Sequence, residues 1–376
     1  MRMDKIRKKY LLITTVTVIA MLGGCGTDRS VKIYTADSEI AAEESSTQKM
    51  ADAQSQQENE STQASRDIFA MDTYMNVTAY GVGANEAVRR AEEEIERLDS
   101  LLSTGDQNSE IYQINQNGGG ILSEDTAYLV ERSLDLYQST NGAFDIAIYP
   151  VMKAWGFTDD NFRVPEEEEL QELLTLTDVN DISYDSRMKE ISFQKEGMQI
   201  DLGGIAKGYT SARIMDIYRE CGIKSGLVNL GGNVQALGTK TDGSKWRVAV
   251  QNPQDTDQYI GVLSIQDKAV ITSGGYERYF EQDGKTYHHI IDPKTGYPAE
   301  NGLISVSIVT ADGTLADGLS TSVFIMGKEV ATEYWRAHSD EFDMILMTDD
   351  RKIYVTEGIA NSFESELDTK IIEKES

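Results

Sequence analysis

Between residues 74 and 102, hydrophobic side chains recur with two different periods. In residues 74–80, Met75, Val77 and Ala79 alternate with polar positions, which is typical of a strand with one buried face. In residues 88–102, apolar side chains return every three or four positions, which predicts a helix with one apolar face. The chain is therefore expected to combine both kinds of element.

The pattern further along predicts helices and short strands in an irregular order. Helices are expected at residues 126–137, 165–174, 209–221, 316–326 and 328–338. Strands are expected at residues 181–184, 189–193, 198–202, 246–250, 261–265, 303–309 and 344–347. Strands and helices do not alternate regularly, so the pattern disfavours a doubly wound sheet and predicts a mixed α+β fold in a single domain.

Residues 1–24 have the pattern of a secretory signal. Five basic side chains within residues 2–9 precede the apolar run L-L-I-T-T-V-T-V-I-A-M-L, which is shorter than the roughly 20 residues of a membrane span. The run ends in L-G-G-C, which resembles a bacterial lipoprotein signal. That resemblance implies cleavage before Cys25, lipidation of its thiol, and an extracytoplasmic protein anchored to the bacterial cell membrane. The alternative is cleavage elsewhere with an incidental cysteine.

Polar segments flank the expected folded domain. Residues 25–66 are rich in Ser, Gln, Glu, Ala and Asp and contain few large apolar side chains. Such a segment cannot bury enough surface to fold, so we expect a disordered tether that begins at the lipidated cysteine. The folded domain is then expected at residues 67–360, with an acidic C-terminal tail at residues 361–376.

Charge and cysteine content narrow the possible functions. The formal net charge of −28 at pH 7 argues against nucleic-acid binding, which needs a basic surface. The same charge is repelled by anionic lipids, so membrane attachment should depend on the lipid anchor. The two cysteines, Cys25 and Cys221, cannot form an intramolecular disulfide if the first is lipidated.

A glycine-rich segment, D-L-G-G-I-A-K-G-Y at residues 201–209, precedes one of the expected helices. It is not a Walker loop, because Lys207 precedes a glycine and no Ser or Thr directly follows the lysine. Free backbone N–H groups at a helix start can still bind a phosphate or pyrophosphate. A tight turn without a ligand remains an equally good interpretation of this segment alone.

Several further motifs occur with this segment in a fixed order. They are F-A-M-D-T at 69–73, L-S-T-G-D-Q-N-S-E-I at 102–111, G-A-F-D-I-A-I-Y-P at 142–150, W-G-F at 155–157, V-N-L-G-G-N at 228–233, I-T-S-G-G-Y-E-R at 271–278, H-I-I-D-P-K-T-G at 289–296 and A-D-G-L-S-T at 316–321. In this order the chain resembles the ApbE family of FAD:protein FMN transferases over about residues 67–360. The resemblance implies an ApbE-like, T-fold-related catalytic domain.

The resemblance also implies a reaction and a metal. FMN would pass from FAD through its phosphate to a threonine of an acceptor protein, and AMP would leave, with Mg²⁺ or another divalent metal required. The metal ligands would be the backbone carbonyl of Gly204 and the side chains of Asp317 and Thr321. A helix cap and a solvated hydroxyl are the structural alternatives for Asp317 and Thr321. Two other functions stay open, an FAD pyrophosphatase that releases FMN and AMP, and an FAD-binding lipoprotein without chemistry.

The same resemblance assigns flavin-binding and catalytic residues. The FAD contacts would be Met71, Ala143, Phe144, Asp145, Asp201, Lys207, His289 and Ile290. His289 and Asp317 would be catalytic, with His289 able to orient or deprotonate the incoming threonine near neutral pH. Core packing is the alternative for Met71 and Phe144, and a purely structural or flavin-contacting role is the alternative for His289.

One position departs from the family pattern. Gly105 stands where relatives can carry an aromatic residue that stacks on the cofactor. This puts in doubt how tightly the cofactor ring is held and how well water is excluded, although Tyr112 or another nearby aromatic residue could compensate. The expected partners are FAD and an acceptor protein with an exposed threonine motif, either a subunit of a membrane redox complex or a secreted flavoprotein.

Overall fold

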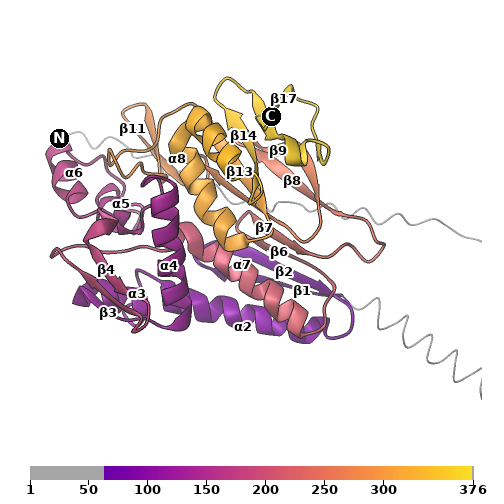
Figure 1. Ribbon diagram of the computed structural model, residues 1–376, viewed down its shortest axis with the longest axis horizontal. Coiled ribbons are helices and arrows are strands. Elements are labelled where there is room, and N and C mark those ends of the chain that lie inside the picture. Colours follow the sequence, from indigo (N-terminus) through magenta and orange to yellow (C-terminus); the bar gives the residue numbers. More distant parts are fainter. Residues whose placement is uncertain (1–62, 375–376) are drawn as a thin grey trace, which may run out of the picture.

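A nine-stranded sheet organises the protein (Figure 1). The computed structural model describes residues 63–374. The strand order is β1-β2-β6-β7-β10-β13-β14-β15-β17, and all neighbours are antiparallel except β15 and β17. The strands are β1 (Gln63–Ala70), β2 (Thr73–Tyr80), β6 (Ser225–Leu230), β7 (Asn233–Leu237), β10 (Ala269–Gly274), β13 (Leu303–Thr310), β14 (Asp343–Thr348), β15 (Ile353–Thr356) and β17 (Thr369–Ile372).

Three long helices cover one face of this sheet, and Figure 1 shows α7 and α8 crossing in front of it. They are α2 (Ala84–Leu102), α7 (Gly203–Glu220) and α8 (Gly313–Ala337). The buried apolar face of α2 packs on β1 and β2, with Ile95 fully buried. Helix α7 lies against both α2 and α8 and also packs on strands β6 and β7 of the sheet.

The opposite face carries a small three-stranded sheet. It consists of β8 (Trp246–Asn252), β9 (Asp255–Ile265) and β16 (Phe363–Glu364), in the order β16-β9-β8. Trp246, Val248 and Leu263 pack on the central strands from this side. The short helix α9 (Glu357–Ala360) follows β15, and its Ile359 joins the same core.

A segment between β2 and β6 adds a smaller layer beside the helices. Its elements are α3 (Glu110–Asn117), β3 (Gly119–Ile121), α4 (Glu124–Ser139), η1 (Ile146–Ile148), α5 (Tyr149–Trp155), α6 (Glu167–Leu174), η2 (Val179–Asp181), β4 (Ile182–Asp185) and β5 (Glu190–Phe193). The buried ring of Trp155 packs against Phe280, from the hairpin of β11 (Tyr279–Gln282) and β12 (Lys285–His288). This contact joins the added layer to the loop region after β10.

Most predicted elements are present, with one clear error. The two helices expected on either side of residue 327 form α8, whose helical geometry is broken at Gly327 (φ 74°), a backbone region that favours glycine. The strand expected at residues 198–202 is absent. There, Ile200 N–H donates to the Asn115 side chain and Asp201 N–H donates to the Ile146 carbonyl, so neither bond belongs to a strand ladder.

The ends of the folded domain extend beyond the expected boundaries. Strand β1 begins at Gln63, inside the segment expected to be a tether, because Ala64 and Ile68 supply a buried face among exposed polar residues. The expected C-terminal tail contains β16 and β17, and Ile372 is buried in the core. The expected signal peptide, most of the tether and Cys25 lie outside the described residues. Within residues 63–374, no helix has the length and apolar character needed to cross a membrane.

Candidate active site

The start of α7 and the first half of α8 come into direct backbone contact at Gly208. The N–H of Gly208 donates a hydrogen bond to Asp317 Oδ2 at 2.8 Å. A methyl group at Gly208 would collide with the carbonyl oxygen of Gly313 and lie 2.5 Å from the Asp317 Cβ. The glycine-rich segment therefore lies in the first turns of α7, where it allows α8 to approach closely.

Asp317 is the buried carboxylate of this crossing, and its side chain is 4% exposed. Its Oδ1 accepts a hydrogen bond from Asn233 Nδ2 at 2.9 Å, and its Oδ2 accepts from Gly208. Burial raises the pKa of Asp317, while the positive charge of Lys207 and these hydrogen bonds lower it. The carboxylate is thus fixed in orientation by donors from α7 and β7.

The three proposed metal ligands lie around the same crossing. A methyl group built on Gly204 would lie 3.1 Å from the Phe144 ring and 4.0 Å from Thr321 Oγ1. The Thr321 hydroxyl has no hydrogen-bond partner among residues 63–374. Oxygen ligands suit Mg²⁺, which usually keeps several waters or substrate phosphate oxygens in addition to one or two carboxylates. The donor set therefore fits Mg²⁺.

This donor set contains only one carboxylate. Across the described part of the chain, no group of three or more His, Cys, Asp or Glu side chains is arranged to hold a metal ion. A magnesium ion at Asp317 would consequently depend on a carbonyl, a hydroxyl and ligands supplied by the substrate.

Positive and negative side chains gather around Lys207, which lies one turn into α7. Burial raises the pKa of Asp201, and Lys207 and Arg278 both lower it. Asp201 Oδ1 also accepts a hydrogen bond from Gly203 N–H at 2.8 Å, at the first residue of the helix. Lys207 therefore lies within electrostatic range of carboxylates without an ion pair to any of them in the described chain, and its ammonium group could bind a phosphate oxygen.

His289 has a defined tautomer. Its Nδ1 lies 3.1 Å from the backbone carbonyl oxygen of Arg278, and since a carbonyl only accepts, Nδ1 carries the proton. Burial lowers the pKa of His289 to about 3, with the positive charge of Arg278 as the next cause. The ring is neutral at physiological pH, and its Nε2 is left with a lone pair.

The remaining flavin-binding predictions divide into two groups. Met71 lies in the β1–β2 turn with its Sδ 3.9 Å from Thr210 Oγ1 of α7, and Phe144 lies against Gly204, so both meet the α7 cluster. Ala143 and Ile290 are buried, 5% and 3% exposed, and Ile290 belongs to the same apolar core as Phe144. Their role in binding FAD stays a prediction.

Asp145 is also nearly buried and has a structural partner. Its Oδ1 accepts from Ala147 N–H at 2.7 Å at the start of η1. Burial raises the pKa of Asp145 to about 7. Near neutral pH, this carboxyl can therefore donate a hydrogen bond as well as accept one.

Three residues of the cluster have no role in the sequence-based prediction. Asn233 orients Asp317, Arg278 holds His289 through its carbonyl, and Glu277 interacts electrostatically with Lys207 and Asp317. Loss of hydration raises the pKa of Glu277, although its side chain keeps contact with solvent. Asn233 lies in the motif V-N-L-G-G-N, and Glu277 and Arg278 lie in I-T-S-G-G-Y-E-R. These two motifs were the sequence signal that could have identified the three residues.

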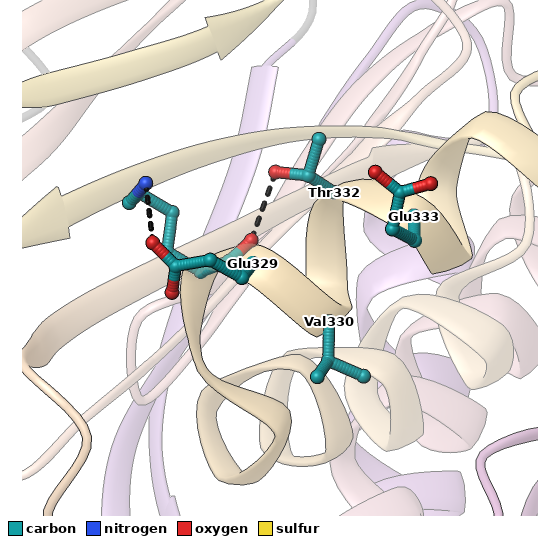
Figure 2. Close-up of a pocket in the computed structure, with 5 residues that line it drawn as sticks. Glu329, Val330, Thr332 and Glu333 are labelled. Carbon is teal, nitrogen blue, oxygen red and sulfur yellow. Dashed lines mark hydrogen bonds and ion pairs between the residues drawn. The ribbon is translucent and has the colours of Figure 1, made fainter.

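The surface depression shown in Figure 2 is not part of this cluster. Its volume is about 320 Å³, and its lining comes from residues 328–333 of α8, beyond the break at Gly327. In Figure 2, Glu329 and Glu333 point along the helix surface and no second element contributes a side chain. One exposed helical turn offers no convergent polar groups, so we assign no function to this depression.

A methyl group at Gly208 should disrupt the crossing of α7 and α8. Gly208→Ala is expected to lower the free energy of unfolding by about 1–3 kcal/mol, because the added carbon overpacks against backbone that cannot rotate away. Urea unfolding measures this loss. Gly105→Ala is the matched control, since the nearest atom to a methyl group there is 3.9 Å away. Equal stability of the two variants would contradict the tight crossing.

Known proteins resemble this chain over most of the described structure. Residues 71–346 match the ApbE family. The FAD:protein FMN transferase of Klebsiella pneumoniae (strain 342) is 35% identical over 266 residues, which are 70% of this chain and 82% of that protein. The FAD:protein FMN transferase of Treponema pallidum (strain Nichols) is 32% identical over 318 residues, 79% of this chain and 88% of that protein.

Solved structures agree with this relationship and with the expected mixed α/β single domain. The ApbE protein of Thermotoga maritima aligns with a TM-score of 0.76 at 32% identity, over 80% of this chain and 99% of that one. The flavin transferase ApbE of Vibrio cholerae aligns with a TM-score of 0.72 at 27% identity, again over 80% and 99%. On this evidence, the chain belongs to the ApbE family.

Proposed function

We propose that this protein transfers FMN from FAD to a threonine hydroxyl of another protein, releasing AMP. The observation that carries the proposal is the α7–α8 crossing, where hydrogen-bond donors and Lys207 surround one buried carboxylate, and a neutral His289 interacts electrostatically with the same lysine. The family relatives named as FAD:protein FMN transferases support the same reaction.

The reaction exchanges the phosphoanhydride bond of FAD for a phosphoester bond to threonine. The threonine oxygen attacks the phosphorus on the FMN side of the pyrophosphate, and the bond from that phosphorus to the bridging oxygen breaks, so AMP leaves with the bridging oxygen. The threonine proton passes to a base, and His289 Nε2 is the neutral acceptor that the cluster provides. Lys207 can bind a phosphate oxygen and stabilise the charge that develops there.

We propose Gly204, Asp317 and Thr321 as the groups that would hold Mg²⁺. When bound, this ion supplies neutralisation of charge on the phosphate oxygens. Asn233 and Gly208 keep the Asp317 carboxylate oriented towards that position through their two hydrogen bonds.

Hydrolysis of FAD is the alternative that one structural observation favours. Gly105 offers no ring for stacking, and the space around it is open. A buried aromatic residue lies nearby, because the Tyr149 hydroxyl donates to the Thr104 carbonyl at 3.5 Å. If that ring does not replace the missing stacking contact, water could compete with threonine and release free FMN.

Mass spectrometry distinguishes these reactions. Residues 63–376 are mixed with FAD, Mg²⁺ and an acceptor domain, here the threonine-bearing soluble domain of a redox protein from the same cells, prepared without its FMN. FMN attached to the threonine, with AMP released in equal amount, supports transfer. Free FMN and AMP without an adduct support the pyrophosphatase, and unchanged bound FAD supports a binding protein.

We further propose that the reaction takes place outside the cytoplasmic membrane, on a redox protein at the same surface. The proposal rests on the secretory pattern of residues 1–24 and on the cysteine at its end. Incorporation of a labelled fatty acid that is lost in Cys25→Ser would support the lipid anchor. Equal labelling of both proteins would contradict it.

A further inference from the structure

The hairpin of β1 and β2 exposes two aromatic rings beside the candidate active site. Phe69 and Tyr74 are directly opposite each other in the hairpin, and their rings contact edge to face with centroids 5.1 Å apart. Phe69 is 64% exposed and Tyr74 is 63% exposed. Exposed aromatic pairs of this kind are enriched at protein interfaces and otherwise cost solubility.

The aromatic pair is connected to the site through the turn that it flanks. Asp72 in this turn lies 3.7 Å from the Arg278 guanidinium, and the Arg278 carbonyl holds His289. On the other side, the Tyr74 carbonyl accepts from Gly231 N–H at 3.1 Å, two residues before Asn233, which holds Asp317. The hairpin is therefore connected, through these contacts, to the residues that hold both catalytic candidates.

The edge of the sheet is open at the same place. Strand β1 is the last strand of the nine-stranded sheet, and among residues 63–374 no strand pairs with its outer edge. Figure 1 shows β1 and β2 at the border of the sheet, beside α2. Unpaired backbone groups of an edge strand can hydrogen-bond an extended segment of another protein.

The charge of this surface distinguishes between two possible binding partners, a second copy of the chain and another protein. Asp67, on the same strand as Phe69, and Asp72, which is 84% exposed, place carboxylates on both sides of the aromatic pair. A second copy of this chain would bring the same carboxylates and a net charge of −28 against them. The surface is complementary to a partner with an apolar contact flanked by basic residues.

We propose that the acceptor protein docks on the Phe69–Tyr74 surface of the β1–β2 hairpin and thereby brings its threonine to the site. This inference rests on the proposed FMN transfer. The partner is an acceptor domain that presents an apolar or aromatic side chain between basic residues. A free threonine peptide too short to reach the hairpin does not use this surface.

The test compares the double variant Phe69→Ser/Tyr74→Ser with the intact protein. The probes are the acceptor domain described above and a short peptide containing the same threonine. With the domain, the double variant should show a KM at least about tenfold higher, a loss of about 1.4 kcal/mol, and an unchanged kcat. With the peptide, both proteins should react equally. Tyr259→Ser, which removes a ring that is 60% exposed on β9, is the matched control.

Each other outcome counts against the docking surface. An unchanged KM for the domain overturns it, and so does an equal loss with domain and peptide, which would mean that the site itself was distorted. A dimer of the intact protein that the double variant loses, seen by analytical ultracentrifugation, would assign the surface to a second copy. If the intact protein transfers no FMN, the proposed function fails. The docking surface is then tested separately by calorimetry, which compares binding of the acceptor domain to the intact protein and to the double variant.

Discussion

Replacing Asp317 with asparagine is expected to lower FMN transfer by roughly 10²–10³-fold. The variant keeps the shape of the side chain but loses the only charged group among the proposed magnesium ligands. Its amide nitrogen also faces a donor, since both carboxylate oxygens accept hydrogen bonds, from Asn233 and Gly208. We therefore also expect unfolding to cost about 1–3 kcal/mol less. The rate of adduct formation, the Mg²⁺ titration and urea unfolding measure these effects.

A second buried carboxylate separates the loss of metal from the loss of stability. Asp343 on β14 is also buried and accepts a hydrogen bond from the Thr356 hydroxyl at 2.9 Å, on a strand that lies three strands away from β7 in the sheet. Asp343→Asn should lose stability and keep its transfer rate. Asp317→Asn transferring within about tenfold of the intact protein, with the same Mg²⁺ dependence, would contradict the metal role.

The elements that the sequence predicted well are those with one buried face. Strand β2 and helix α2 have alternating or helical burial, so the periodicity of their apolar residues is visible. Strands β6 and β7 are buried almost throughout, with no such alternation, and Asn233 and Gln235 of β7 hydrogen-bond to helices α8 and α7 across the core. Nothing in the local sequence indicates which helices these strands pack against, so neither strand was predicted.

Long-range hydrogen bonds also explain why no strand forms at residues 198–202, where one was predicted. Its apolar residues alternate, but its backbone is satisfied by Asn115, which is 85 residues away from Ile200. Periodicity describes burial and does not reveal which group accepts or donates the backbone hydrogen bonds. The same limit applies to β1 and β17, where few buried side chains signal the strand.

The motifs in the sequence name candidate site residues, but they do not reveal which side chains hydrogen-bond to those residues. The ordered motifs name Asp317, Lys207 and His289 as candidates, and the fold packs α7, which carries Lys207, against α8, which carries Asp317. The partners that orient these residues lie far along the chain. Asn233 is 84 residues from Asp317, and their bond depends on the register of β7 against the helices. The sequence alone carries no local sign of such a pair.

His289→Gln is expected to lower the rate of transfer by about 10²–10⁴-fold with little change in FAD binding. Glutamine can still donate to the Arg278 carbonyl but offers no basic nitrogen to the threonine hydroxyl. Transfer rates and FAD titrations measure the two effects separately. His288→Gln is the matched control, because both nitrogens of His288 already have partners, at Ala299 and Ile290. Equal losses of transfer and FAD binding in His289→Gln would remove the catalytic role.

The buried environment of His289 also predicts a dependence of stability on pH. Its pKa in the folded protein is about 3, below the value of about 6.5 for an unfolded chain. Below pH 6.5 the unfolded chain binds a proton that the folded protein does not, so the intact protein should lose stability relative to His289→Gln as the pH falls towards 4. After allowance for partial exposure, we expect about 1–2 kcal/mol at pH 5. Urea unfolding curves that run parallel for the two proteins from pH 7 to pH 4 would show that the imidazole is hydrated in the folded protein, and would contradict the lowered pKa of His289.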